Sequence, residues 1–204
     1  MKSLLMAALF GSVLSIGSMH AAPLFSECPA VGSNTGCQFL ITVNADNTTT
    51  VAEDTVAPNN GPYDASDDTL VGVLNNSSKN VNSLPISSST TIFGFEGDGA
   101  CTQTPAPASC GSDSSGYGGP NATFSGISAD TTSGTVNFPT GLAAGQSTWF
   151  ALEDSLTLSQ ITPGTPGTGP GTGPSSSTPE PGSLLTLGTG LLGLGLYIKR
   201  AKRA

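Results

Sequence analysis

The chain has 204 residues, few charges and a strong acidic bias, with six Lys and Arg against 14 Asp and Glu and a net charge of −8. Between residues 23 and 178, thirteen acids face a single cation, Lys79, which gives this stretch a net charge of −12. Such a surface repels phosphate backbones, so nucleic acid is not an expected partner. The only histidine, His20, lies near the N-terminus. The rest of the chain therefore cannot build a His-dependent catalytic triad or a His-ligated metal centre.

The first 22 residues predict a signal peptide. Lys2 supplies the positive start, residues 4–16 form an apolar stretch, and residues 18–22 are mostly small. This order is typical of a secretory signal, with cleavage expected after Ala21. The sequence thus predicts that the protein is exported.

The four cysteines fit an exported protein. An even number of cysteines outside the cytosol indicates disulfide bonds, and four allow three connectivities. Cys28 and Cys37 are nine residues apart, as are Cys101 and Cys110, and each pair brackets a loop rich in small and polar residues. We therefore predict local pairing, Cys28 with Cys37 and Cys101 with Cys110. A zinc site would need closer Cys-x-x-Cys spacing.

Short segments rich in β-branched and aromatic residues follow one another from residue 38 to 161. Turns rich in Gly, Asn, Asp and Ser separate nearly all of them, and no long window shows a helical period. The pattern predicts an all-β domain over residues 23–162, a single β-sandwich with jelly-roll-like or Ig-like wiring. The predicted strands are residues 38–43, 48–52, 69–74, 81–86, 90–95, 122–127, 134–138, 148–152 and 156–161.

Two loops place acids close together in a way that favours calcium. Asp64, Asp67 and Asp68 form the first group, and Glu96 and Asp98 the second, both in turn-forming sequence. Carboxylate oxygens are the ligands that Ca²⁺ prefers, although neither loop is a complete EF-hand. We predict a calcium site at Asp64, Asp67 and Asp68 and no other cofactor. The alternative is that these acids are solvated loop residues that keep the protein soluble.

The acids also raise the alternative of a glycoside hydrolase, which needs two carboxylates about 5 to 10 Å apart. Neighbouring acids that could supply them are Glu53 with Asp54, Asp67 with Asp68, Glu96 with Asp98 and Glu153 with Asp154. Sugar-binding clefts also use exposed aromatic platforms, and Trp149 is the only tryptophan. Its strand-like surroundings predict a core position. We therefore expect no enzyme activity and no catalytic residues.

The C-terminal part begins with residues 163–178, a Gly, Pro, Thr and Ser-rich run that predicts a linker. Pro179, Glu180 and Pro181 follow, then an uncharged stretch at residues 182–198 that predicts a transmembrane helix, and a tail at residues 199–204 with four cations. The basic tail would stay in the cytoplasm. The alternative is a plain membrane anchor, but the stretch spans only about 25 Å, less than the roughly 30 Å hydrocarbon core.

This order of motif, helix and basic tail at residues 179–204 resembles the PEP-CTERM sorting signal of exported bacterial proteins. The resemblance implies an exosortase-type membrane protease as partner, a membrane-anchored stage before processing, and delivery to the cell surface or an extracellular polysaccharide matrix. Residues 92–99 and 133–153 also resemble a recurrent group of proteins with this tag. The resemblance to that group implies no catalytic residues.

Taken together, the sequence predicts an exported structural or adhesive component of the cell surface or matrix. The alternatives are a calcium-assisted carbohydrate-binding module and, third, a glycoside hydrolase.

Overall fold

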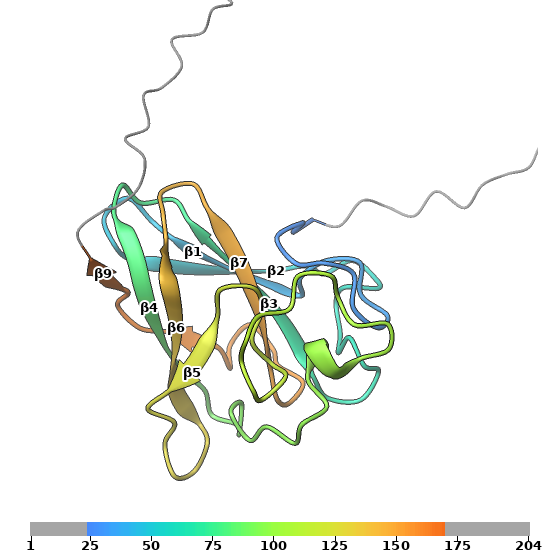
Figure 1. Ribbon diagram of the computed structural model, residues 1–204. Helices are drawn as coiled ribbons and strands as arrows, with labels where there is room; N and C mark the ends of the chain where they lie inside the picture. The colour runs from blue at the N-terminus through green and yellow to red at the C-terminus, as the bar shows by residue number, and fades with distance from the viewer. Residues whose placement is uncertain (1–23, 170–204) are drawn as a thin grey trace, which may run out of the picture.

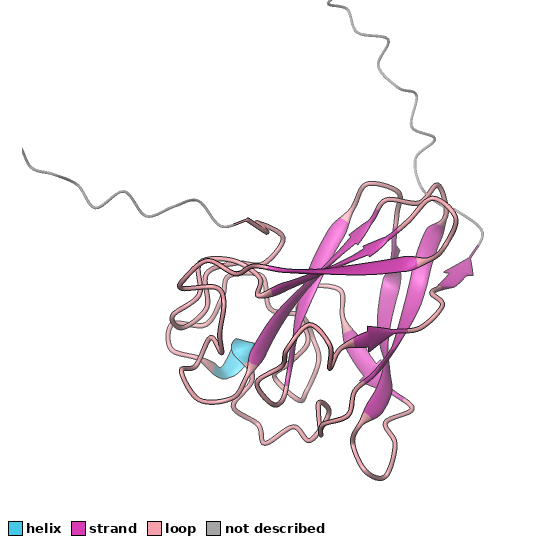
Figure 2. Ribbon diagram, turned by 180° about the vertical axis from the view of Figure 1, so that it is seen from behind, coloured by secondary structure: helices cyan, strands magenta, loops and turns pink. Residues whose placement is uncertain are grey.

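The computed structural model describes residues 24–169, which form two β-sheets stacked face to face, with one short 3-10 turn, η1 (Ala100–Thr102) (Figure 2). The predicted all-β sandwich is therefore confirmed in class. The predicted signal peptide and C-terminal helix lie outside the described residues. Within residues 24–169 there is no helix with the length and apolar character needed to cross a bilayer.

The two sheets contain nine strands in the described part of the chain, and all but β8 are labelled in Figure 1. The first sheet has the strand order β2 (Thr49–Glu53), β1 (Phe39–Val43), β3 (Thr69–Asn75) and β7 (Ser147–Leu152). The second has the order β5 (Thr123–Ser125), β6 (Ser133–Leu142) and β4 (Asn80–Ser87), with β8 (Thr162–Pro163) and β9 (Gly167–Gly169) both pairing with β4. All pairs are antiparallel except β1 with β3.

The main core lies between the sheets and follows the period-two alternation of strands. On β1 the alternate residues Phe39, Ile41 and Val43 are fully buried, while the residues between them are half-buried. They pack with apolar residues of β3, β4, β6 and β7. A strand with one buried face is the pattern expected in a sandwich.

A second apolar cluster covers the outer face of the first sheet, where β3 and β7 are buried on both sides. Leu70 and Trp149 point into it from these strands. The covering layer consists of loops rather than another sheet, and it contributes Tyr63 and Tyr117. Trp149 is 2% exposed, and its Nε1 donates a hydrogen bond to Ser109 Oγ at 3.3 Å. Its predicted core position is confirmed.

Both predicted disulfides are present in this loop layer. The Cα atoms of Cys28 and Cys37 are 5.0 Å apart, and those of Cys101 and Cys110 are 5.6 Å apart. The first bridge lies directly against β3. A Cβ on Gly72 would lie 2.5 Å from Cys37 Sγ, so only glycine leaves room for the sulfur at this point of the strand.

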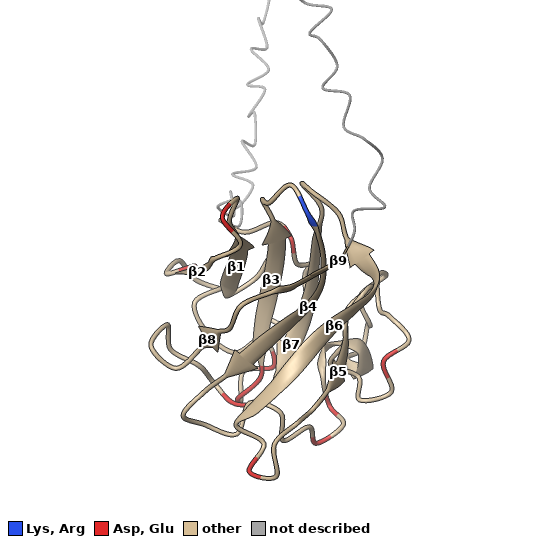
Figure 3. Ribbon diagram, turned by 90° about the vertical axis from the view of Figure 1, so that its left-hand side faces the viewer, with Lys and Arg blue, Asp and Glu red and all other residues tan. Residues whose placement is uncertain are grey.

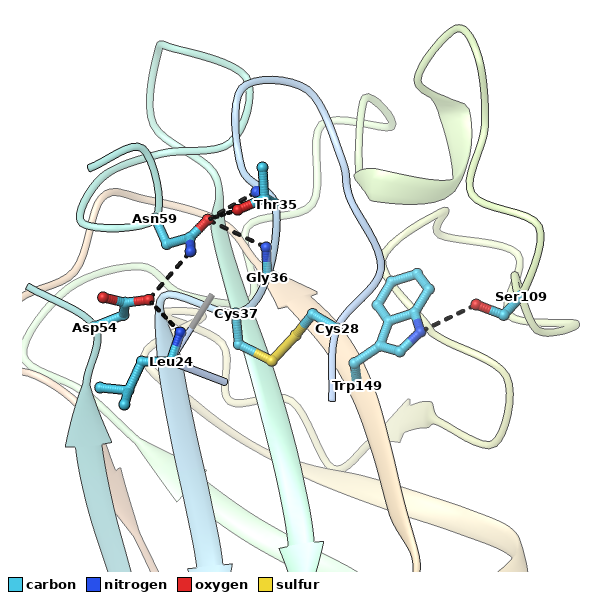
Figure 4. The surroundings of a disulfide bond; sticks show 9 residues. All are labelled: Leu24, Cys28, Thr35, Gly36, Cys37, Asp54, Asn59, Ser109 and Trp149. Atoms are coloured by element: carbon cyan, nitrogen blue, oxygen red, sulfur yellow. Dashed lines mark hydrogen bonds between the residues drawn. A yellow bond between two sulfur atoms is a disulfide. The ribbon is translucent and has the colours of Figure 1, made fainter. Parts of the chain in front are cut away.

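Beside the first disulfide, Asn59 holds three segments together (Figure 4). The Oδ1 atom of this buried side chain accepts hydrogen bonds from the amides of Thr35, at 2.7 Å, and Gly36, at 3.1 Å. Its Nδ2 donates to Asp54 Oδ2 at 3.1 Å, and that oxygen also accepts from the Leu24 amide at 3.2 Å. The N-terminal end of the described domain is thus tied to the disulfide loop through the Asp54 carboxylate and the Asn59 amide.

Replacing Asn59 with Ala is expected to lower the free energy of unfolding by about 3 kcal/mol, because it leaves the Thr35 and Gly36 amides without their acceptor and removes one donor from the buried Asp54 carboxylate. Chemical denaturation measures the change. Asn60 is the matched control, since its side chain is exposed, and Asn60→Ala should change the stability by less than about 0.5 kcal/mol. Equal losses in the two variants would contradict the proposed tie.

Two of the predicted strands are wrong. Residues 90–95 form a turn, in which the Gly94 amide bonds to the Thr91 carbonyl oxygen at 3.1 Å. Residues 156–161 also turn, with the Gln160 amide bonded to the Thr157 carbonyl oxygen at 2.9 Å. Both segments resemble strands in composition because they insert apolar side chains, Ile92 among them, into the main core. Their backbones, however, form local turns and no continuous ladder with a neighbouring strand.

The predicted linker also begins too early. Residues 163 and 167–169 pair with β4, with Thr168 opposite Val81, so the folded part extends at least to Gly169. A Cβ on Gly167 would come closer to Ser83 Oγ than any van der Waals contact allows. The Gly-rich composition that indicated a linker is thus partly a requirement for close approach to β4.

A chain ending at Gly169 is therefore expected to be more stable than one ending at residue 162, by about 1 to 2 kcal/mol, because β9 adds ladder hydrogen bonds to β4. Thermal unfolding of the two purified chains measures this difference. Identical melting temperatures of the two chains would show that residues 163–169 belong to the linker and not to the folded domain.

Candidate functional site

Three carboxylates from two separate segments meet at one end of the first sheet. One oxygen each from Asp67, Asp68 and Glu153 lies within 4.8 Å of the other two. Asp68 directly precedes β3 and Glu153 directly follows β7. These strands pair antiparallel, with Thr69 opposite Leu152, so the start of one lies beside the end of the other. The ladder itself therefore brings the acids together.

Two tyrosine hydroxyls point into this group of acids. Tyr63, fully buried, donates a hydrogen bond to Asp68 Oδ2 at 2.5 Å. The hydroxyl oxygen of Tyr117, also fully buried, lies 2.6 Å from Glu153 Oε2 and 2.7 Å from Asp98 Oδ1. It also lies 3.4 Å from Asp68 Oδ1. We call Asp67, Asp68, Asp98 and Glu153, with these two hydroxyls, the acid cluster.

The loop that supplies Asp98 and Tyr117 is closed on itself. The Cys101 amide donates to the Gly116 carbonyl oxygen at 2.9 Å, which joins the two ends of the loop. The Tyr117 ring stacks on the Phe95 ring, with their centroids 4.4 Å apart. The edge of the Tyr117 ring lies so close to Gly99 that a Cβ at that position would clash with it. The second disulfide staples the intervening residues. The hydroxyl of Tyr117 is thus held in place by packing as well as by hydrogen bonds.

Asp64 has a different task from the one predicted. Its Oδ1 accepts hydrogen bonds from the amides of Ser66, Asp67 and Asp68 at 3.0, 3.2 and 3.2 Å, and so it shapes the loop before β3. The structure brings together Asp67 and Asp68 of the predicted calcium ligands and adds Glu153 in place of Asp64. The calcium ion itself remains a prediction.

The acid cluster concentrates negative charge in a buried place. Asp68 is 1% exposed and Glu153 is 6% exposed, whereas Asp67 and Asp98 are exposed at the rim. Burial, together with the nearby charge of Glu153, raises the pKa of Asp68 to about 7, even though the Tyr63 hydrogen bond acts in the opposite direction. Burial also raises the pKa of Glu153. Each charged carboxylate here raises the free energy needed to ionise the others.

The only cation among residues 24–169, Lys79, lies far from the acid cluster. The carbonyl oxygen of Lys79 accepts a hydrogen bond from the side chain of Asn75, which is the last residue of β3. Asp68, in contrast, lies just before the first residue of this strand. Six strand residues at about 3.3 Å each separate the two ends by roughly 20 Å. Figure 3 shows the single blue segment at the end of the sheets where β4 begins. Lys79 therefore does not neutralise the acids.

The raised pKa of Asp68 predicts a pH-dependent stability in the absence of divalent ions. The folded state holds a proton on Asp68 that the unfolded state releases above its ordinary pKa of 3.8. The contribution of this proton to the free energy of unfolding is therefore fully present below about pH 4, and it is lost as the pH rises toward 7. Asp64, Asp98 and Glu153 face this carboxyl and add to the effect.

We expect the melting temperature to be about 5 °C higher at pH 5 than at pH 8. Asp68→Asn should flatten this slope, because an amide carries no charge at either pH. Asp130→Asn is the control, since Asp130 is exposed and hydrogen bonds from Ser128 and Thr132 lower its pKa. Scanning calorimetry at both pH values measures the slopes, and a slope that Asp68→Asn leaves unchanged would contradict the assignment.

The acid pairs considered for a hydrolase are placed differently from one another. Asp154 points away from the acid cluster, and its Oδ2 accepts hydrogen bonds from the amide and hydroxyl of Thr91 at 3.1 and 2.8 Å. Asp54 is buried in the tie to Asn59. Every aromatic side chain among residues 24–169 is buried or half-buried. The acid cluster therefore has no exposed aromatic platform beside it in the described part of the chain.

Sequence reasoning missed Glu153 and both tyrosines as members of one site. The prediction of a second loop at Glu96 and Asp98 was closer, because Asp98 does reach the cluster and the Glu96 amide donates to Glu153 Oε2 at 3.2 Å. No spacing in the sequence indicates that the two loops meet. Their meeting depends on how the loop layer packs over β3 and β7.

A protein-family model described as the PEP-CTERM protein-sorting motif matches residues 177–201. No curated protein and no solved structure matches the chain. The matched range includes Pro179, Glu180 and Pro181, and the predicted PEP-CTERM signal is confirmed. The chain thus carries a PEP-CTERM sorting signal, and this signal implies an exported protein that an exosortase processes.

Proposed function

We propose that the protein is a structural or adhesive component of the cell surface or of the extracellular polysaccharide matrix, released there after an exosortase removes its C-terminal tag. The single observation that carries this proposal is the sorting motif at residues 177–201, a few residues after the last described strand, β9. A folded domain followed closely by this signal is the arrangement expected of a protein that is exported and then cleaved from its C-terminal tag.

The organisation of the described part supports a structural role over an enzymatic one. Two disulfides stabilise the loop layer, and the aromatic side chains that could form a sugar platform are used in packing. The net charge of −12 over residues 23–178 keeps such a domain soluble in a hydrated layer. Structural components need durability outside the cell, and disulfides contribute it.

The second candidate function is a calcium-assisted carbohydrate-binding module. The acid cluster favours it, because exposed Asp67 and Asp98 lie at the mouth of a group of buried oxygens. Calcium bound at such a rim offers open coordination positions to sugar hydroxyls. The lack of an exposed aromatic residue in the described part makes it the weaker of the two.

The role of the tag is tested by replacing Pro179, Glu180 and Pro181 with Ala in the full chain. The variant is expected to stay in the membrane fraction at full length, because the apolar stretch still inserts while the protease loses its recognition element. Pro170→Ala with Pro174→Ala is the matched control and should be processed normally. Release of the triple variant into the medium at the wild-type rate would contradict processing at this motif.

The role after release is tested with the processed protein recovered from the medium. It should bind again to washed matrix from cells that lack the gene, and the same protein after reduction and alkylation should not, because the loop layer depends on its disulfides. Sedimentation with the matrix measures binding. Equal sedimentation of the native and reduced forms, or of neither, would remove the basis for a matrix role.

A further inference from the structure

The hydrogen bonds of the acid cluster require one more positive charge than the described residues supply. A tyrosine hydroxyl carries one hydrogen. The Tyr117 oxygen nevertheless lies within hydrogen-bonding distance of Glu153, Asp98 and Asp68, at 2.6, 2.7 and 3.4 Å. It can donate to only one of these carboxylates. Because Tyr63 donates to Asp68 Oδ2, the other oxygen, Oδ1, is left without a donor whenever Tyr117 serves a closer acid.

Among the described residues, the only hydrogen-bond partner of Asp68 Oδ1 is thus the distant Tyr117 hydroxyl, which it loses whenever that hydroxyl donates to a closer acid, and the Asp68 side chain is 1% exposed. An unpaired buried carboxylate oxygen is costly, and several carboxylates around one phenol oxygen add to that cost. Lys79, the only cation among residues 24–169, lies at the opposite end of β3. The missing positive charge must come from solution.

We propose that the acid cluster is a binding site for one divalent cation, Ca²⁺, with Asp68 and Glu153 as the buried ligands and Asp67 and Asp98 at the open side. Calcium lies 2.3 to 2.6 Å from its oxygen ligands, so ligands on opposite sides of the ion are about 5 Å apart. The oxygens of Asp67, Asp68 and Glu153, all within 4.8 Å of one another, fit around one such ion.

The chemistry of the donors selects the kind of ion. The cluster offers only carboxylate and phenol oxygens, which favour hard cations over zinc or copper. Its ligands come from three separate segments, before β3, after β7 and ahead of η1. Ca²⁺ accepts varied and flexible ligand geometry, whereas Mg²⁺ demands a tight octahedron and loses its water reluctantly. The exposed rim leaves room for water on the bound calcium.

The proposal goes beyond the role in the matrix, and each can fail without the other. Bound calcium would join the loop before β3 to the loop of Asp98 and Tyr117, which the second disulfide closes. An ion that binds only the folded state raises its stability in proportion to the logarithm of ion concentration over Kd. The expected Kd is about 10⁻⁴ to 10⁻³ M, as in other extracellular calcium modules.

The test uses the processed protein recovered from the medium, stripped with a chelator and titrated with CaCl₂ in a calorimeter. Wild type should bind one Ca²⁺, and Glu153→Gln should weaken binding at least tenfold. Asp98→Asn, a substitution at the exposed rim that should not disturb folding, should weaken it about threefold or more. Asp154→Asn is the matched control, since it removes one charge next to Glu153 from a carboxylate that faces Thr91, and it should bind as wild type does.

A second measurement separates calcium from a proton shared among the acids. Binding at pH 6 should release protons, so the observed heat should differ between buffers of different ionisation enthalpy. Saturating calcium should also raise the melting temperature by several degrees, more than Mg²⁺ or Na⁺ at equal ionic strength. Equal shifts for the three ions, or equal affinities of the Glu153→Gln and Asp154→Asn variants, would overturn the site. A wild type that binds no calcium would show that a proton alone supplies the missing charge.

Discussion

The antiparallel pairing of β3 with β7 is the interaction on which the rest of the structure depends (Figure 1). Both strands are buried on both faces, so the same ladder presents Val71 and Phe150 to the space between the sheets and Leu70 and Trp149 to the loop layer. Their central residues are apolar on both faces, which is uncommon in antiparallel pairs. The ladder also ends in Asp68 on one side and Glu153 on the other.

Buried acids at the end of such a ladder make the stability of the protein depend on its surroundings. The apolar residues of β3 and β7 hold Asp68 and Glu153 in place whether or not the acids carry charge. Protonation or a cation then decides how much this arrangement costs. An intracellular protein meets little free calcium, but an exported one folds and works where calcium is plentiful. The location implied by the C-terminal motif and the chemistry of the acids are thus compatible.

Much of the sandwich could be predicted because local chemistry determined it. Asn44 to Asn47 form the turn between β1 and β2, where Asn47 has a φ of 67°, a conformation that asparagine tolerates well. Alternation identified β1 and β4. The turns at residues 90–95 and 156–161 were misread because core side chains on a turn have the composition of a strand. The acid cluster could be predicted only in part, since Glu153 and Asp68 are 85 positions apart and only the β3–β7 register joins them.

The prolines around β8 and β9 have a consequence for how copies of the protein meet one another. Pro163 lies within β8, and Pro166 comes just before the three-residue β9. Proline has no amide hydrogen to offer to a neighbouring strand, and a very short edge gives an incoming chain little to pair with. An incoming strand therefore finds few backbone groups to pair with along this edge in the described part of the chain, which disfavours a sheet shared between neighbouring molecules.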